Sequence, residues 1–109
     1  MFQAMDKIVE KTLLFDYYGE LLTTHQQEIY EDVVFNDMSL SEAADCYGIS
    51  RQGIHDLIRR CDKALSEYEE KLHMLARADK IRKKTETLLK SAGPEEERIL
   101  KGILEDLES

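Results

Sequence analysis

The stretch from Leu40 to Cys61 reads LSEAADCYGISRQGIHDLIRRC, and it decides the fold of this chain of 109 residues. Ser39, just before it, forms a capping box with Glu42, so a short helix begins there. Gly48 supplies the positive backbone dihedral that a tight turn needs, and Ser50 caps a second helix. The stretch therefore predicts two helices joined by a tight turn, a helix-turn-helix.

The apolar residues of this stretch predict how its two helices pack. Ala44 is small and falls where the helices of a helix-turn-helix cross closely. Ile49, Ile54 and Leu57 fall where they would lock the second helix onto the first. These positions leave the opposite side of the second helix free to face outward.

The outward side of the second helix carries Arg51, Gln52, His55 and Arg59. In a helix-turn-helix the amino-terminal part of this helix enters a major groove. Arginine and glutamine are the residue types that read guanine and adenine edges there. The four residues are therefore candidate nucleic-acid contacts, and the alternative is a helical hairpin that binds nothing.

Helical patterns also cover the rest of the chain. Apolar residues from Ile8 to Leu22 recur at spacings of three and four, which predicts an amphipathic helix. Thr24 and Gln27 match a capping box that starts a second helix, and Asn36 with Asp37 ends it.

A long helix follows Ser50, since neither Gly nor Pro occurs between Ile54 and Ala92. A regular apolar seam alternates steps of four and three along it, through Ile54, Ile58, Cys61, Leu65, Tyr68, Leu72 and Leu75. Later apolar residues fall out of phase, which predicts a bend or break near Ala78. Gly93 and Pro94 separate this segment from a last helix, whose expected buried residues are Ile99, Leu100, Ile103, Leu104 and Leu107.

These patterns predict a single all-α domain over residues 1–109. Residues 5–63 form its helix-turn-helix core, with a winged-helix-like DNA-binding topology that lacks strands, and residues 64–109 form a helical extension with dimer contacts. The long helix and the carboxyl-terminal helix complete the architecture. We assign most of the apolar seam to the core and the remainder to a two-fold dimer interface.

Charge is distributed unevenly along this chain of formal net charge -8. Residues 1–50 carry two basic and ten acidic side chains, whereas residues 51–63 carry four basic and two acidic ones. Residues 71–93 carry seven basic and two acidic side chains, among them Arg82, Lys83 and Lys84, which we expect to add phosphate contacts. Arg77, Lys80 and Lys84 share one helix face, so a basic stripe is plausible, although an ordinary solvated face explains it equally well. So much acidic surface predicts weak binding by the protein alone.

Several functions are not expected from this sequence. No phosphate-binding loop or nucleophile elbow occurs, so we expect no enzyme. Cys46 and Cys61 stand apart without zinc-like pairing, so we expect reduced cysteines, no metal site and no cofactor. Neither a membrane span nor a secretory signal is recognisable, and we expect a cytoplasmic protein without membrane contact.

The run LSEAADCYGISRQGIHDLIRR resembles the fourth region of bacterial sigma factors, the part that recognises the promoter -35 element. The longer run LLTTHQQEIYEDVVFNDMSLSEAADCYGISRQGIHDLIRRCDKALSEYEEKL more closely resembles the YlxM family. These are small bacterial helix-turn-helix proteins encoded next to the signal recognition particle GTPase. The resemblance covers Asp6 to roughly Leu75, and its matching positions are Gln26, SLSE from Ser39, Ala44, SRQ from Ser50 and EYEEKL ending at Leu72. Ala43 and Gly53 depart from it, because a larger aliphatic residue and an alanine are usual there.

The resemblance implies an all-helical, dimeric protein that takes part in or regulates the signal recognition particle pathway and binds nucleic acid. The nucleic acid could be DNA or RNA. An adaptor that binds the particle's GTPase through helix faces, and a plain DNA-binding transcription regulator, are the alternatives.

Overall fold

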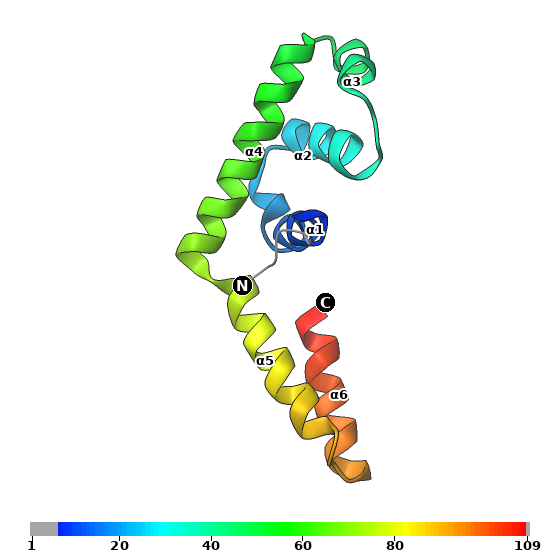
Figure 1. Cartoon of the computed structure of the whole chain (residues 1–109), viewed down its shortest axis with the longest axis vertical. Helices are drawn as coiled ribbons and strands as arrows, with labels where there is room; N and C mark the ends of the chain where they lie inside the picture. Colours follow the sequence, from blue (N-terminus) through cyan, green and yellow to red (C-terminus); the bar gives the residue numbers. More distant parts are fainter. Residues whose placement is uncertain (1–6, 109) are drawn as a thin grey trace. The chain divides into compact units, whose positions relative to one another are not determined.

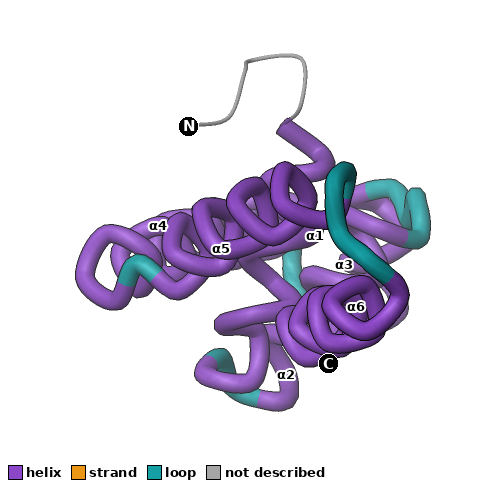
Figure 2. Tube along the Cα trace, turned by 90° about the horizontal axis from the view of Figure 1, so that it is seen from below, coloured by secondary structure: helices purple, strands orange, loops and turns teal. Residues whose placement is uncertain are grey.

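A computed structural model describes residues 7–108, which form helices joined by short loops and contain no strand (Figures 1 and 2). The elements are α1 (Lys7–Tyr18), the 3-10 helix η2 (Gly19–Leu21), α2 (Thr24–Tyr30), the π-helix η3 (Glu31–Phe35), α3 (Leu40–Tyr47), α4 (Arg51–Leu72), α5 (Met74–Leu89) and α6 (Pro94–Glu108). The predicted all-α fold class is confirmed.

The helices form two compact units, which divide after Leu72. The first unit contains α1 to α4, and the second contains α5 and α6. The boundary predicted after residue 63 falls inside α4, which continues to Leu72. Residues 5 and 6 of the predicted core lie outside the described residues.

The core of the first unit lies where α2, α3 and α4 meet. Ile29, Ala43 and Ile54 contribute one side chain from each helix, and all three are fully buried. Leu57 and Ala44 pack against them and are partly buried. The predicted packing of Ile54 and Leu57 is therefore confirmed.

Two details of the predicted helix-turn-helix packing differ in the structure. Ile49 is 37% exposed and does not pack against the buried core, although its side chain lies beside Gly53 of α4. It lies in the turn, before α4 begins. Ala43 rather than Ala44 is the fully buried small residue of α3.

α1 covers the carboxyl-terminal half of α4 (Figure 1). Leu14 and Tyr18 are its buried residues, and the ring of Tyr18 lies 6.1 Å from that of Tyr68 on α4. The Phe15 ring stacks on Tyr30 of α2 at a centroid distance of 5.4 Å. These aromatic contacts join α1 to both α2 and α4.

Three tyrosine hydroxyls donate hydrogen bonds to carboxylates elsewhere in the first unit. They join Tyr18 to Glu69 at 2.6 Å, Tyr30 to Asp62 at 2.6 Å, and Tyr47 to Asp32. The Lys11 ammonium also lies 3.5 Å from the Asp62 carboxylate. Each bond links different elements, so together they fix α1, α2 and α3 on their neighbours.

Helix caps in the structure match the predicted positions, with one exception. The capping box of Ser39 and Glu42 is confirmed. The box predicted at Thr24 and Gln27 is wrong by one position, because Thr23 has the extended backbone and accepts from the Gln26 amide. The Gln27 side chain instead donates to the Leu22 carbonyl at 2.9 Å.

The long helical segment is interrupted at His73. This residue has a φ of 56° in the left-handed region and separates α4 from α5. The break predicted near Ala78 is therefore wrong in position, since Ala78 lies inside α5. A histidine in place of a glycine or proline gives no sequence signal for a helix end.

The second unit is a hairpin of α5 and α6. The turn between them ends at Pro94, and Glu95, Glu96 and Glu97 follow in the first turn of α6, where negative charge suits the helix dipole. Of the predicted buried residues of α6, only Leu100 is fully buried. Ile99 is 52% exposed and Ile103 is 37% exposed, so their predicted burial is wrong. A hairpin of two helices offers each helix one neighbour, which covers a single narrow face.

Among residues 7–108, no helix is long and apolar enough to cross a membrane.

Gly48 provides a test of the turn. It has a φ of 70°, and a Cβ added there would meet no atom within 4 Å, so backbone strain is the expected cost of a side chain. We expect Gly48→Ala to lower the free energy of unfolding by about 1 kcal/mol, and Gly48→Asn to lower it less, because asparagine tolerates this conformation. All five tyrosines lie before position 73, so tyrosine fluorescence in urea reports on the first unit. An equal loss in both variants would contradict the dihedral explanation.

The hydrogen bonds from tyrosine hydroxyls to carboxylates predict that the fold becomes less stable at alkaline pH. The hydrogen bond to Asp32 raises the pKa of Tyr47 to about 12, and burial followed by the bond to Asp62 raises the pKa of Tyr30. When the pKa of a tyrosine is higher in the folded state than in the unfolded state, its contribution to stability is complete at pH values below the unfolded pKa of about 10. This contribution is lost as the pH rises above about 10. We expect the urea midpoint to fall between about pH 10 and 12, and to fall less in Tyr47→Phe. Ring NMR signals of Tyr30 and Tyr47 that titrate with midpoints near 10 would contradict this.

Candidate nucleic-acid interface

The start of α4 is fixed by its cap and by the turn before it. The Ser50 hydroxyl accepts a hydrogen bond from the Gly53 amide at 2.9 Å, and the Ser50 carbonyl accepts from the Ile54 amide at 3.0 Å. Gly48 closes α3 in the left-handed conformation, as predicted. These contacts determine which side chains occupy the first turns of α4.

The four candidate reading residues, Arg51, Gln52, His55 and Arg59, are all exposed on the amino-terminal half of α4. Ile54 on the opposite side is fully buried in the core. The structure therefore brings the four together on the outward side of one helix.

Asp56 lies among these residues, and the sequence analysis did not identify it. Its carboxylate accepts a hydrogen bond from the Gln52 amide at 2.9 Å and lies 3.8 Å from His55 Nδ1. The bond holds Gln52 against its own helix, and the carboxylate places a negative charge within a basic surface. The spacing of four between a glutamine and an aspartate was the available signal.

Arg60 and Lys63 also belong to this surface and were missed. With Asp56 and Arg59 they line a shallow hollow of about 350 Å³ on the outer side of α4. We call the hollow lined by Arg59, Arg60 and Lys63 the basic hollow. The signal in the sequence was the local excess of positive charge over residues 51–63.

Arg82, Lys83 and Lys84, the other predicted phosphate contacts, lie on α5 in the second unit. The Asp79 carboxylate is 3.0 Å from the Lys83 ammonium and 3.9 Å from the Arg82 guanidinium. Asp79 thus offsets part of this positive charge. Ile81 and Leu88 of α5 are 45% and 59% exposed, so this helix presents apolar as well as basic surface.

The two cysteines lie in different environments. Cys46 is exposed, whereas Cys61 is fully buried in α4. Burial and the neighbouring Asp62 raise the pKa of the Cys61 thiol to about 11, so the thiolate is scarce at neutral pH. Within residues 7–108, no group of three or more His, Cys, Asp or Glu side chains is placed to hold a metal ion.

Two helices joined by a Gly48 turn, with an exposed and partly basic second helix, define a helix-turn-helix protein. Residues 5–104 match the model of the UPF0122 family, described as "Putative helix-turn-helix protein, YlxM / p13 like". The chain belongs to this family, which confirms the resemblance identified in its sequence. That description is of a helix-turn-helix family and not of an enzyme family.

Several curated proteins are similar to this chain. UPF0122 protein STH1464 of Symbiobacterium thermophilum is 49% identical over 72 residues, which are 66% of this chain and 67% of that protein. A UPF0122 protein of Acetivibrio thermocellus is 40% identical over an alignment of 112 positions, which covers 95% of this chain and 96% of that protein. UPF0122 protein BH2485 of Halalkalibacterium halodurans is 37% identical over an alignment of 109 positions, which covers 96% of this chain and 97% of that protein. The last two similarities span nearly the whole chain, so the second unit is shared as well.

The Ser50 cap gives a test of how the surface is positioned. We expect Ser50→Ala to lower the free energy of unfolding by about 1 kcal/mol, because the Gly53 amide loses its hydrogen-bond acceptor at the start of α4. Ser41→Ala, an exposed position inside α3, is the matched control and should change stability little. Urea denaturation followed by tyrosine fluorescence measures both, and equal midpoints for the two variants would contradict the role of the cap.

Proposed function

We propose that this protein binds nucleic acid through the amino-terminal half of α4 and acts as an accessory or regulatory protein rather than as an enzyme. One observation carries the proposal. Arg51, Gln52, His55 and Arg59 are exposed together on a helix whose other face is buried in a helix-turn-helix core. This is the arrangement by which a recognition helix presents side chains to a major groove.

The positive charge of α4 supports contacts with the phosphate backbone of a nucleic acid, in addition to contacts with its bases. Arg51, Arg59, Arg60 and Lys63 are exposed cations on one helix, while Asp56 is the one acid that the hollow includes. Arg82, Lys83 and Lys84 of α5 would add phosphate contacts in the second unit. The net charge of -8 opposes association, so we expect modest affinity that falls steeply with salt.

The pathway is a finer part of the proposal and is based on the resemblance to the YlxM family. We propose that the protein takes part in or regulates the signal recognition particle pathway, held in place by a component of that particle. A homodimer and a cytoplasmic location belong to the same proposal. The exposed Ile81, Leu88, Ile99 and Ile103 of the second unit are among the apolar residues available for protein contacts.

An adaptor for the particle's GTPase is the second candidate function. It is favoured by the acidic surface of the first unit, where Glu28 and Glu31 are exposed and would suit a basic partner. Asp32 is less suitable for a charge-reversal test, because it accepts the Tyr47 hydroxyl and supports the fold. Copurification that survives nuclease and is lost in a Glu28→Lys, Glu31→Lys variant would favour the adaptor.

Fluorescence anisotropy of the full chain against the particle's RNA and against random duplex DNA, from about 50 to 200 mM salt, tests nucleic-acid binding. We expect saturable binding that Arg51→Ala and Arg59→Ala each weaken about threefold or more, while circular dichroism stays unchanged. Arg98→Ala is the matched control, because Arg98 is an exposed arginine of α6 that pairs with Glu95.

Unchanged affinity in both α4 variants would contradict the assigned surface. Weak and featureless binding to both nucleic acids would contradict the proposed function and favour the adaptor. Saturable binding to the particle's RNA that has a steep salt dependence and is tighter than binding to DNA would support a site of action on the particle.

A further inference from the structure

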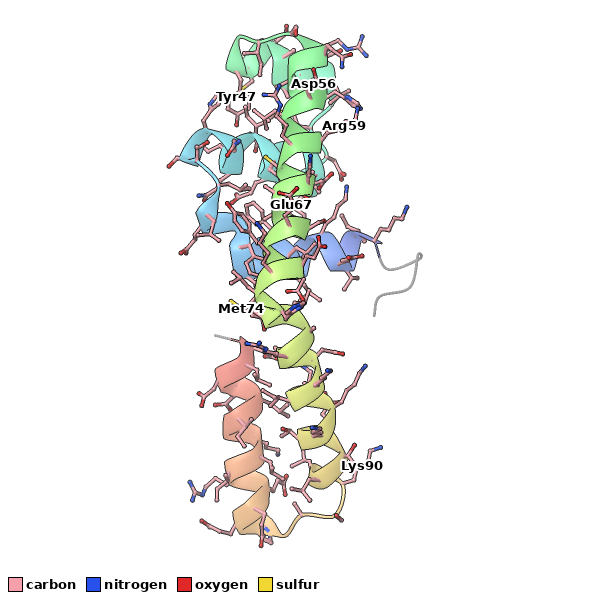
Figure 3. The ribbon with its side chains drawn as sticks, turned by 90° about the vertical axis from the view of Figure 1, so that its left-hand side faces the viewer. Tyr47, Asp56, Arg59, Glu67, Met74 and Lys90 are labelled. Carbon is pink, nitrogen blue, oxygen red and sulfur yellow. The ribbon has the colours of Figure 1, made fainter. Side chains whose placement is uncertain are left out.

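One continuous stripe of polar residues runs along the outer side of α4. Its members follow one another at steps of four, three, four, four and three, so they share one face: Gln52, Asp56, Arg59, Lys63, Glu67 and Glu70. We call this set the polar stripe. Figure 3 labels Asp56, Arg59 and Glu67 in this order along α4. Ile54, Cys61 and Leu65 on the other face are fully buried.

The sign of charge changes twice along this stripe. Asp56 is acidic, Arg59 and Lys63 are cationic, and the last two members, Glu67 and Glu70, are both exposed carboxylates. Arg60 stands beside the basic part and lines the same hollow. The second change, after Lys63, turns the stripe from basic to acidic.

The length of α4 explains why this change of sign matters. The helix has 22 residues and is about 33 Å long, whereas a major groove is about 12 Å wide. If such a helix enters the groove by its first turns at an angle to the groove, its later turns leave the groove and pass a sugar-phosphate backbone. Arg59 lies about 12 Å from Arg51 along the axis and Lys63 about 18 Å, so these residues are placed where the backbone passes.

We infer that the basic hollow of Arg59, Arg60 and Lys63 receives a phosphodiester of the strand that borders the groove, and that Glu67 and Glu70 end the part of α4 that contacts nucleic acid. The inference is based on the proposed function and extends it to Arg60 and Lys63, and to a boundary on α4. Arg59, Arg60 and Lys63 outweigh the Asp56 carboxylate that lines the same hollow, and Glu67 and Glu70 repel any phosphate that lies further along the helix.

The fit of α4 to a major groove distinguishes duplex DNA from duplex RNA as the ligand. A helix enters the major groove of B-form DNA, but the major groove of A-form RNA is too narrow and deep for it. The structure thus favours duplex DNA as the ligand of α4. Duplex RNA of the same length is the comparison in the experiment.

The test compares two lysines of the same helix. Lys63 lines the basic hollow, and Lys71 is exposed beyond Glu67 and Glu70, about 12 Å further along α4. Lys63→Gln and Lys71→Gln remove the same charge from the full chain. Anisotropy with a labelled duplex of about 20 base pairs, from about 50 to 200 mM salt, gives the salt slope of each variant.

The salt slope is the slope of the logarithm of the affinity against the logarithm of the salt concentration. We expect Lys63→Gln to reduce the size of this slope by about one, so that its affinity falls about 3.5-fold less than that of the wild type over this range. Lys71→Gln should keep the wild-type slope. Glu67→Gln should bind more tightly than the wild type, whereas Glu20→Gln, exposed on η2, should not. Arg60→Gln should resemble Lys63→Gln.

Equal slopes for Lys63→Gln and Lys71→Gln, with binding that Arg51→Ala still weakens, would overturn the inference and leave the proposed function intact. Absence of binding by the wild-type chain would overturn both. Tighter binding to duplex RNA than to duplex DNA would overturn the groove geometry on which the inference depends.

Discussion

The packing of Ile29, Ala43 and Ile54 is the contact on which the helix-turn-helix depends. Each residue comes from a different helix, and none has exposed surface. The small side chain of Ala43 lets α3 approach α4 closely, and Ile54 then fixes the rotation of α4 about its own axis. Truncating a buried isoleucine to alanine costs about 2 to 5 kcal/mol, which is a large part of the stability of a small domain. The direction of the polar stripe follows from this rotation, because the buried face determines which residues remain outside.

Hydrogen bonds from tyrosine hydroxyls give three of the acids that make up the net charge a role in the fold. Asp32, Asp62 and Glu69 count toward the charge of -8, yet each accepts a hydrogen bond from a tyrosine within the first unit. These acids support the fold in addition to contributing to the surface field. Each carboxylate keeps its charge, so the local excess of positive charge over residues 51–63 comes from the four cations there, which outnumber Asp56 and Asp62.

Much of the first unit could be predicted from sequence, because its signals are local. The Ser39 capping box, the Gly48 turn and the Ser50 cap are short-range hydrogen bonds and dihedrals that particular residue types require. The break at His73 was not predicted, since a positive φ is uncommon at a residue other than glycine. The exposure of Ile49, Ile99 and Ile103 was missed because periodicity identifies an apolar face without identifying what covers it. For the site, residue types on α4 indicated Arg51, Gln52, His55 and Arg59, whereas Asp56, Arg60 and Lys63 became apparent from the hydrogen bond and the hollow.

The central claim is that the outer side of α4 contacts nucleic acid from its first turn to Lys63 and no further. A titration of the isotope-labelled full chain with duplex DNA, followed by backbone amide NMR shifts, tests it most directly. Within the first unit, the account predicts shifts concentrated on residues 51–63, with the amides of Glu67 and Glu70 little changed and the core amides of Ile29 and Ala43 unaffected. Shifts centred on α6, or spread evenly along α4 beyond Glu70, would contradict it.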